Sequence, residues 1–134
     1  MHALETYDYA IIRVVPRVER EEFINVGVIA SCHATSFIAA RIELDEARLR
    51  ALDPGVDLLV VQRHLAVIPL ICAGGADAGP IGLLPARARF HWLTAKRSSL
   101  IQTSPAHTGR SHDLDATVEQ LLRTMVRAPT TRPR

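Results

Sequence analysis

The chain has 134 residues, of which 48% are hydrophobic and 22% charged, and its formal net charge is +2. This is the balance of an ordinary globular protein of one domain. It excludes a membrane-spanning chain, since the longest apolar run, 65–73, is too short to cross a bilayer and contains Pro69. The two cysteines, Cys32 and Cys72, form no metal-ligand or redox pair. We therefore expect reduced core thiols in a cytoplasmic protein without a cofactor.

The chain shows no internal repeat and no linker. We expect one α+β domain over residues 1–127, followed by a flexible Arg/Pro/Thr tail over 128–134. The first residues are acidic and lack the apolar stretch of a signal peptide, so the sequence gives no indication of export.

Three strands are predicted in the first third of the chain. Apolar residues alternate with polar ones, or run together, in 7–15, 22–32 and 36–44. Pro16 ends the first strand. Because the connections between the three strands are short, an antiparallel meander is expected.

Helical patterns and a second pair of strands follow. The patterns predict helices over 45–51, 54–73 and 115–127, and a strand pair over 88–93 and 100–103. The resulting order is βββααββα. It predicts an α+β fold in which an antiparallel sheet of about five strands carries helices packed on one face.

The face of this sheet that points away from the helices mixes aromatic, Arg, Asn and His side chains. A solvated sheet face normally carries scattered Lys, Glu and Thr, so the mixture indicates a groove or a subunit interface. The alternative is a partly exposed sheet whose arginines extend to solvent. Strand alternation assigns to this face Tyr9, Ile11, Arg13, Phe23, Asn25, Gly27, Arg41, Arg89, His91 and Gln102.

Asn25 and Gly27 are poor strand formers in the middle of a predicted strand. A glycine in such a place usually marks a bulge, or the close approach of another backbone or a ligand. Local rules tend to be broken at functional or strained sites, so both residues are candidates for a binding site.

A basic segment over 87–110 carries five basic residues and no acidic one. Its predicted turn contains Lys96, Arg97, Ser98 and Ser99. Cationic side chains, hydroxyls and free turn amides together suit a phosphate or a carboxylate. The alternative is an ordinary solvated hairpin turn. Together with the strand candidates, the predicted ligand-binding residues are Arg13, Asn25, Gly27, Arg89, Arg97, Ser98, Ser99 and Gln102.

His91 and His107 are the candidates for acid–base catalysis, because imidazole titrates near neutrality. Neither has an obvious carboxylate to orient it. A Ser–His hydrolase that used Ser98, Ser99 or Ser104 with His107 would lack the glycine-flanked nucleophile elbow. A metal site that adds His112 and Asp113 to these histidines matches no strong template. No catalytic constellation and no metal site are therefore assigned.

Five stretches carry a family resemblance: YAIIRVVP at 9–16, EFINVGV at 22–28, RFHWL at 89–93, IQTSP at 101–105 and HTG at 107–109. They resemble the bacterial family catalogued as domain of unknown function 3037, over nearly the whole chain. The family pattern often has Gly where this chain has Glu21, and Pro where it has Lys96. The resemblance implies no established activity, cofactor or catalytic residue. It does imply a protein partner, because genes of the family often lie beside kinase-like proteins of the HipA type.

Three functions stay open. The first is an interaction or regulatory module whose mixed sheet face binds a protein partner or a second copy of the chain. Another is weak, nonspecific nucleic-acid binding through the basic segment and tail, although no recognised RNA or DNA motif is present. The remaining one is a small-anion or nucleotide-binding enzyme. In that enzyme Arg13, Arg89 and Arg97 would bind the anion, Asn25 and Gln102 would orient it, and His91 would move protons.

Overall fold

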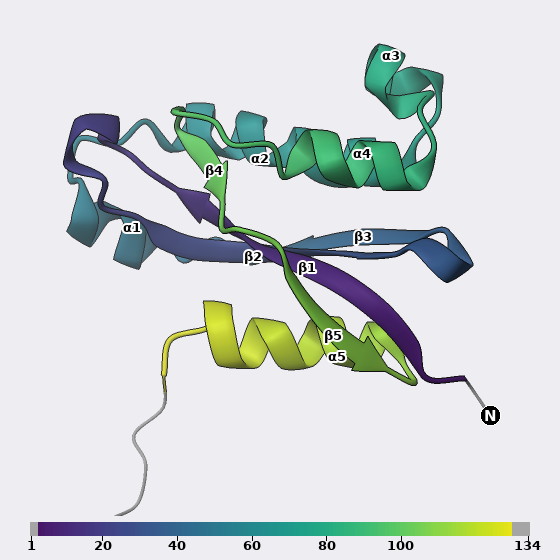
Figure 1. The fold of residues 1–134 in the computed structure, drawn as a ribbon. Helices are drawn as coiled ribbons and strands as arrows, with labels where there is room; N and C mark the ends of the chain where they lie inside the picture. Colours follow the sequence, from purple (N-terminus) through teal and green to yellow (C-terminus); the bar gives the residue numbers. More distant parts are fainter. Residues whose placement is uncertain (1–2, 130–134) are drawn as a thin grey trace, which may run out of the picture.

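The computed structural model describes residues 3–129, and within them five strands form one antiparallel sheet (Figure 1). The order across the sheet is β3-β2-β1-β4, and β5 also pairs with β1. The predicted α+β fold with an antiparallel sheet of about five strands is confirmed. Most of the predicted tail, from residue 130 onward, lies outside the described residues. The strands are β1 (Glu5–Val14), β2 (Ile24–Cys32), β3 (Phe37–Ile42), β4 (Ile101–Thr103) and β5 (His107–Ser111).

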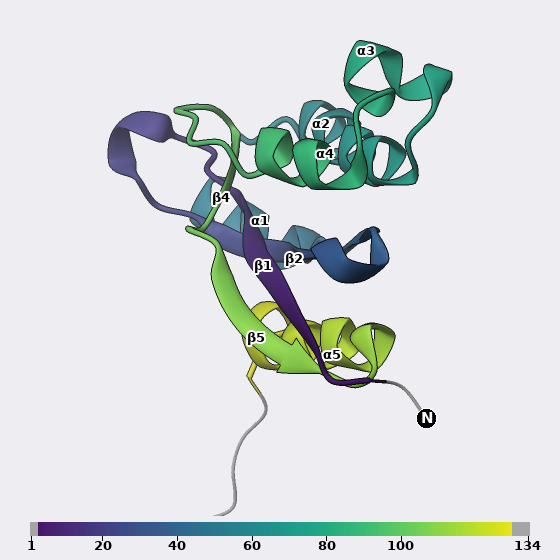
Figure 2. The same cartoon turned by 45° about the vertical axis from the view of Figure 1, so that its right-hand side comes forward.

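β1 lies at the centre because both of its edges are paired. One edge pairs with β2. Along the other edge, the first half of β1 pairs with β5 and the last residues of β1 pair with β4 (Figure 2). Ser104 lies between these two short strands. Its backbone N–H donates to the Ile11 carbonyl, and its Oγ accepts the Ile11 N–H, both at 2.8 Å. The hydroxyl thus replaces a strand carbonyl where the partner strand bends, so that no polar group of β1 is left unpaired there.

A β-bulge interrupts the β1–β2 pairing. Ile12 faces Gly27 and Arg13 faces Asn25, which leaves Val26 as an extra residue on β2. The alternation of β2 therefore reverses at this point. Val26 packs into the cluster on one face of the sheet, whereas Val28 packs into the cluster on the other. The unbroken alternation expected of a strand over 22–32 would place both valines on one face, and the bulge breaks it.

Gly27 allows β3 to approach the bulge. A Cβ at this position would lie 2.6 Å from the Arg41 carbonyl oxygen and 3.2 Å from the Ile42 Cα. Any side chain here would push β3 away, so the glycine is required by the close approach of two backbones.

Three helices pack on the first face of the sheet: α1 (Glu46–Leu52), α2 (Leu58–Ala73) and α4 (Ala86–Leu93). An aspartate caps the start of each of the first two helices. The Asp45 carboxylate accepts the Arg48 backbone N–H at α1, and the Asp57 carboxylate accepts the Val60 backbone N–H at α2. A short 3-10 turn, η3 (Ala76–Ala78), and the single-turn helix α3 (Gly79–Gly82) connect α2 to α4. The buried residues of the core on this face are Ala10, Ile12, Val14, Ile24, Val26, Ile29, Leu49, Val61, Leu65, Ile68, Ile71, Cys72, Phe90 and Leu93.

The segment 86–93 is a helix, and the predicted strand over 88–93 was wrong. Phe90 and Leu93 are buried against the sheet, and their spacing of three residues is that of one helical face. The run also lacks β-branched residues and contains two Ala and two Arg, which are good helix formers. Arg89 and His91 therefore lie on a helix and not on the sheet face to which alternation assigned them.

The second face of the sheet is covered by α5 (Leu114–Leu121) and the π-helical turn η4 (Leu122–Val126), which lie below the sheet in Figure 1. The prediction that the helices pack on one face was therefore wrong. The face expected to be open instead carries a second core. Its buried residues are Tyr7, Ile11, Val28, Cys32, Leu121, Leu122 and Val126.

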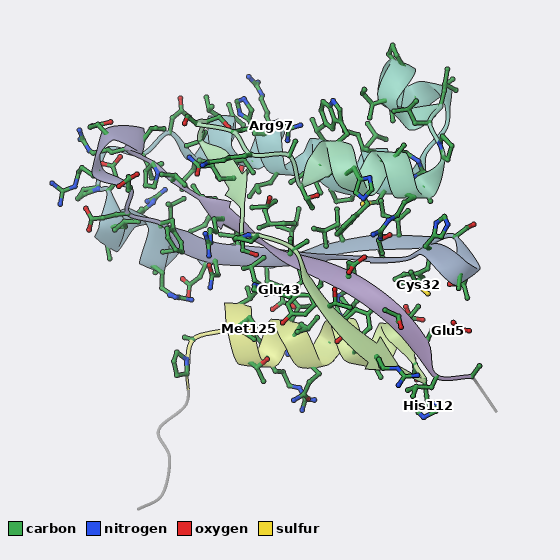
Figure 3. All side chains as sticks on the ribbon, in the orientation of Figure 1. Glu5, Cys32, Glu43, Arg97, His112 and Met125 are labelled. Atoms are coloured by element: carbon green, nitrogen blue, oxygen red, sulfur yellow. The ribbon has the colours of Figure 1, made fainter. Side chains whose placement is uncertain are left out.

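A group of polar contacts holds the end of this second layer. Arg127 donates to both carboxylate oxygens of Glu43, at 2.7 and 2.8 Å, and to Glu119 at 2.9 Å. Arg41 also reaches Glu119 at 2.8 Å. The Asn25 amide donates to the Met125 carbonyl at 2.9 Å. Figure 3 shows Glu43 and Met125 on the side of the sheet that α5 covers. We call the Arg41, Glu43, Glu119 and Arg127 group the charge cluster.

In residues 3–129, no helix is long and apolar enough to cross a membrane.

Replacing Gly27 with Ala is expected to destabilise the protein by about 1–3 kcal/mol, because the new methyl group overlaps the β3 backbone. Gly55→Ala is the matched control, since the nearest atom to its Cβ would be 3.7 Å away. Urea denaturation followed by circular dichroism measures both variants. Equal stabilities for the two would contradict the close approach.

The charge cluster predicts a pH dependence of stability. Hydrogen bonds from Arg127 lower the pKa of Glu43 and of Glu119 below their ordinary value of 4.5. A carboxylate whose pKa is lowered in the folded protein stabilises the fold fully at a pH above its ordinary pKa. This stabilisation is lost as the pH falls through the lowered pKa. Arg127→Gln should therefore reduce the drop in unfolding free energy between about pH 7 and pH 3.5.

The control for this experiment is Arg123→Gln, because Arg123 contacts Gln120 and lies outside the charge cluster. It should retain the pH dependence of the unchanged protein. The same flattening in both variants would show that the charge cluster is not its source.

Candidate functional site

A groove of about 550 Å³ lies where β1 and β4 end. Three segments of the chain form it. They are the end of β1, the connection from β1 to β2, and the segment that runs from the end of α4 into the start of the β4–β5 bend. The residues that line the groove are Arg13, Val15, Val18, Glu21, Phe23, Thr94, Lys96, Arg97, Ser98, Gln102, Thr103, Ser104 and Pro105.

Arg13 lies in the wall of this groove with its guanidinium group 4.2 Å above the centre of the Phe23 ring. Its Nε is buried, and among the described residues it has no hydrogen-bond partner. No carboxylate of residues 3–129 forms an ion pair with Arg13. A buried donor without a partner is costly, and a positive group stacked on an aromatic ring keeps its N–H edges available.

Arg97 comes from the other side of the groove, just after α4. Its guanidinium group stacks on Trp92 at 4.4 Å and donates to the carbonyls of Trp92 and Leu93 at the end of α4. Figure 3 shows it on the α2 and α4 side of the sheet, beside β4. These contacts use part of the five N–H donors and fix the position of the group.

Positive charge predominates in the groove. Arg13, Lys96 and Arg97 face a single acidic residue of the lining, Glu21. Glu21 ends the 3-10 turn η1 (Val18–Arg20) with a φ of 57°, which is the left-handed conformation that glycine adopts without strain. Guanidinium and ammonium groups together with hydroxyls form a suitable set of donors for a phosphate or carboxylate.

Four of the eight predicted ligand-binding residues come together here. Arg13, Arg97, Ser98 and Gln102 line the groove. The Gln102 amide N–H donates to the Ser99 carbonyl at 2.9 Å, which leaves its side-chain oxygen available. Ser99 itself donates its hydroxyl to the Ile101 carbonyl at 2.8 Å and does not line the groove.

The other three residues lie elsewhere. Asn25 is held by the Met125 carbonyl under η4, and Gly27 lies against β3. Arg89 donates to the carbonyls of Ile71 at 2.9 Å and Cys72 at 2.6 Å. Arg89 therefore completes the hydrogen bonding at the end of α2, and it lies outside the groove because 86–93 is a helix.

Arg89 also lies close to the Cys72 thiol. Burial raises the pKa of this thiol to about 11, and the nearby charge of Arg89 lowers it less than burial raises it. A thiol with this pKa stays protonated near neutral pH and is a poor nucleophile.

The two predicted catalytic histidines do not line the groove. His91 is exposed on α4, and His107 is exposed on β5 with its ring 5.4 Å from that of Tyr9. Asp8 of β1 lies between these two elements, since it pairs with Thr108 of β5 and contacts Arg87 of α4. Partial burial tends to raise its pKa, but hydrogen bonds from Thr108 at 2.7 Å and Arg87 at 2.6 Å outweigh burial and lower the pKa. Asp8 therefore ties α4 and β5 to β1.

Within residues 3–129, no three His, Cys, Asp or Glu side chains are placed to hold a metal ion. Sequence reasoning missed the contribution of Val18, Glu21 and Pro105 to the groove. These residues lie in connections whose path cannot be read from periodicity. For Pro105 the available signal was its place in the basic segment without acidic residues, whereas that signal does not extend to Val18 or Glu21.

Arg89→Ala is expected to destabilise the protein by about 1–3 kcal/mol, because carbonyls at the end of α2 lose their charged donor. Arg63→Ala, at an exposed position of α2, is the control and should change the stability by less than about 0.5 kcal/mol. Thermal denaturation distinguishes the two. If Arg89→Ala were as stable as the control, Arg89 would not hold the end of α2.

Comparisons with known proteins identify a family for this chain. A family model described as "Protein of unknown function (DUF3037)" matches residues 9–126, which include every residue that lines the groove. No curated protein and no solved structure matches the chain.

Proposed function

Because the chain belongs to the family of proteins of unknown function DUF3037, we propose its role from its own geometry: it binds a small phosphate- or carboxylate-bearing molecule in the groove. The observation that carries this proposal is Arg13, whose guanidinium group lies in the groove wall without a carboxylate partner among the described residues. An anion in the groove would supply acceptors for this group.

The other groove residues support an anion in the same place. Arg97 and Lys96 add two positive charges, and the exposed hydroxyl of Ser98 adds a donor. Ion pairs occupy many arginines elsewhere in the described part of the chain, for example Arg87 with Asp8 and Arg127 with Glu43. Arg13, Lys96 and Arg97 form no ion pair with a described carboxylate, and the groove brings these three cations together.

Binding is proposed here in preference to catalysis. The lining contains no histidine and no cysteine, which are the side chains best suited to move protons or attack a substrate near neutral pH. The predicted enzyme would need His91 in the groove, and His91 lies on the exposed side of α4.

An interaction module is a weaker proposal on this structure. The sheet face suggested for it is covered by α5, with Ile11 only 6% exposed. A HipA-type partner or a second copy of the chain stays a prediction and would need another surface. Nonspecific nucleic-acid binding has less support, because Arg87 and Arg89 of the basic segment make contacts within the fold and do not line the groove.

Thermal denaturation in low salt with inorganic phosphate, pyrophosphate or citrate tests the proposal. An anion at about 100 times its Kd would stabilise the protein by about 2.7 kcal/mol. Arg13→Gln should weaken binding by about tenfold or more, since it removes a charged donor. Glu21→Gln should have the opposite effect and strengthen binding, because it removes the acidic residue of the lining.

Arg20→Gln is the matched control, since Arg20 is exposed, pairs with Glu22 and does not line the groove. It should respond to anions like the unchanged protein. The proposal fails if none of the three anions raises the melting temperature, or if the Arg13 and Arg20 variants respond alike.

A further inference from the structure

We propose that the ligand is an amphiphilic anion, an acyl or aryl carboxylate or phosphate, whose hydrophobic part enters an apolar cavity beside the groove. This inference rests on the proposed function, because the groove supplies the binding site for the anionic group. The apolar cavity, of about 230 Å³, lies between α2, the end of α4 and β4.

The walls of the apolar cavity are mainly hydrophobic. Val67, Ile68 and Ile71 come from α2, Trp92 from α4 and Ile101 from β4. Val67 and Trp92 are 46% and 41% exposed, so the apolar cavity opens to solvent and is not part of the closed core. Large apolar side chains that stay exposed around a cavity are typical of a surface that a ligand covers.

The apolar cavity and the groove adjoin each other. Arg97, Gln102 and Thr103 line both of them. The Arg97 guanidinium group stacks on Trp92, the aromatic residue of the apolar cavity, while its side chain also lines the groove. A cation at the junction of an anion site and an apolar site favours a molecule that carries its charge at one end.

The polar groups of the apolar cavity are largely occupied by contacts within the protein. The Ser99 hydroxyl donates to the Ile101 carbonyl at 2.8 Å, and the Gln102 amide donates to the Ser99 carbonyl at 2.9 Å. The His64 Nδ1 lies 2.8 Å from the Val60 carbonyl oxygen. Few donors are left to recognise the edge of a nucleobase, so the apolar cavity favours an alkyl or aryl group over a nucleotide base.

Trp92 provides a direct reporter because it is the one tryptophan of the sequence. Its fluorescence would be followed during titrations with inorganic phosphate, n-butyl phosphate, n-hexyl phosphate, phenyl phosphate and AMP. We expect affinity to increase from inorganic to n-hexyl phosphate, by up to about fourfold for each buried methylene group. The alkyl and phenyl esters should change the Trp92 emission more than inorganic phosphate does.

Val67→Phe should fill part of the apolar cavity, remove the gain from the longer alkyl chain, and leave the binding of inorganic phosphate unchanged. The matched control is Leu59→Phe, at an exposed position of α2 outside the apolar cavity, and it should keep the dependence on chain length. The series of esters on the unchanged protein tests the proposal even if a variant does not fold.

The outcomes separate this inference from the proposed function. Inorganic phosphate that binds through Arg13, with no gain from any alkyl or phenyl group, would overturn the inference alone. If the affinity of the alkyl esters rises with alkyl-chain length but is unchanged by Arg13→Gln, the anion binds outside the groove, and the proposed function is overturned. AMP that binds more tightly than both n-hexyl and phenyl phosphate would overturn the assignment of the apolar cavity to an alkyl or aryl group.

Discussion

The extra residue in β2 at Val26 decides which side chains each layer of helices receives. Before the bulge, Ile24 and Val26 pack toward α2; after it, Val28 and Cys32 pack toward α5. One strand thus supplies two cores, and both faces of the sheet need a helical cover. Gly27 makes the bulge compatible with β3, because its missing Cβ leaves room for the Arg41 carbonyl. The second layer then becomes part of the fold, held at its end by the charge cluster.

The bulge also determines the surroundings of Arg13. It pairs Arg13 with Asn25, whose amide binds the last turn of the second layer at Met125. On the opposite edge of β1, Arg13 faces Gln102 of β4. The guanidinium group lies in the groove wall over the Phe23 ring, and it forms no ion pair with a carboxylate of the described residues. The same pairing that builds the second core thus leaves a positive group in the groove.

Much of the fold could be predicted because the longest elements carry strong patterns. The first three strands, α2 and α5 follow alternation or a helical apolar stripe. The segment 86–93 was harder, since a short run with Phe90 and Trp92 two residues apart satisfies strand alternation, while Phe90 and Leu93 satisfy a helical face. The absence of β-branched residues favours the helix, and the burial of Phe90 and Leu93 against the sheet agrees with it. Half of the predicted ligand-binding residues lie together in the groove. Arg89 does not, because its assignment depended on that segment being a strand. Asn25 does not, because η4 covers its face of the sheet and accepts a hydrogen bond from its amide.

Local residue chemistry was sufficient to determine an α+β chain with an antiparallel sheet, a buried first strand and a basic segment without acidic residues. It also marked Asn25 and Gly27 as an irregularity in β2. Two questions needed the tertiary structure: whether that irregularity was a bulge or a ligand contact, and which arginines would find partners. Both answers depend on residues distant in the chain, such as Arg41 beside Gly27 and Glu43 beside Arg127. Periodicity describes one segment at a time, whereas a bulge and an unpaired charge are properties of two segments in contact.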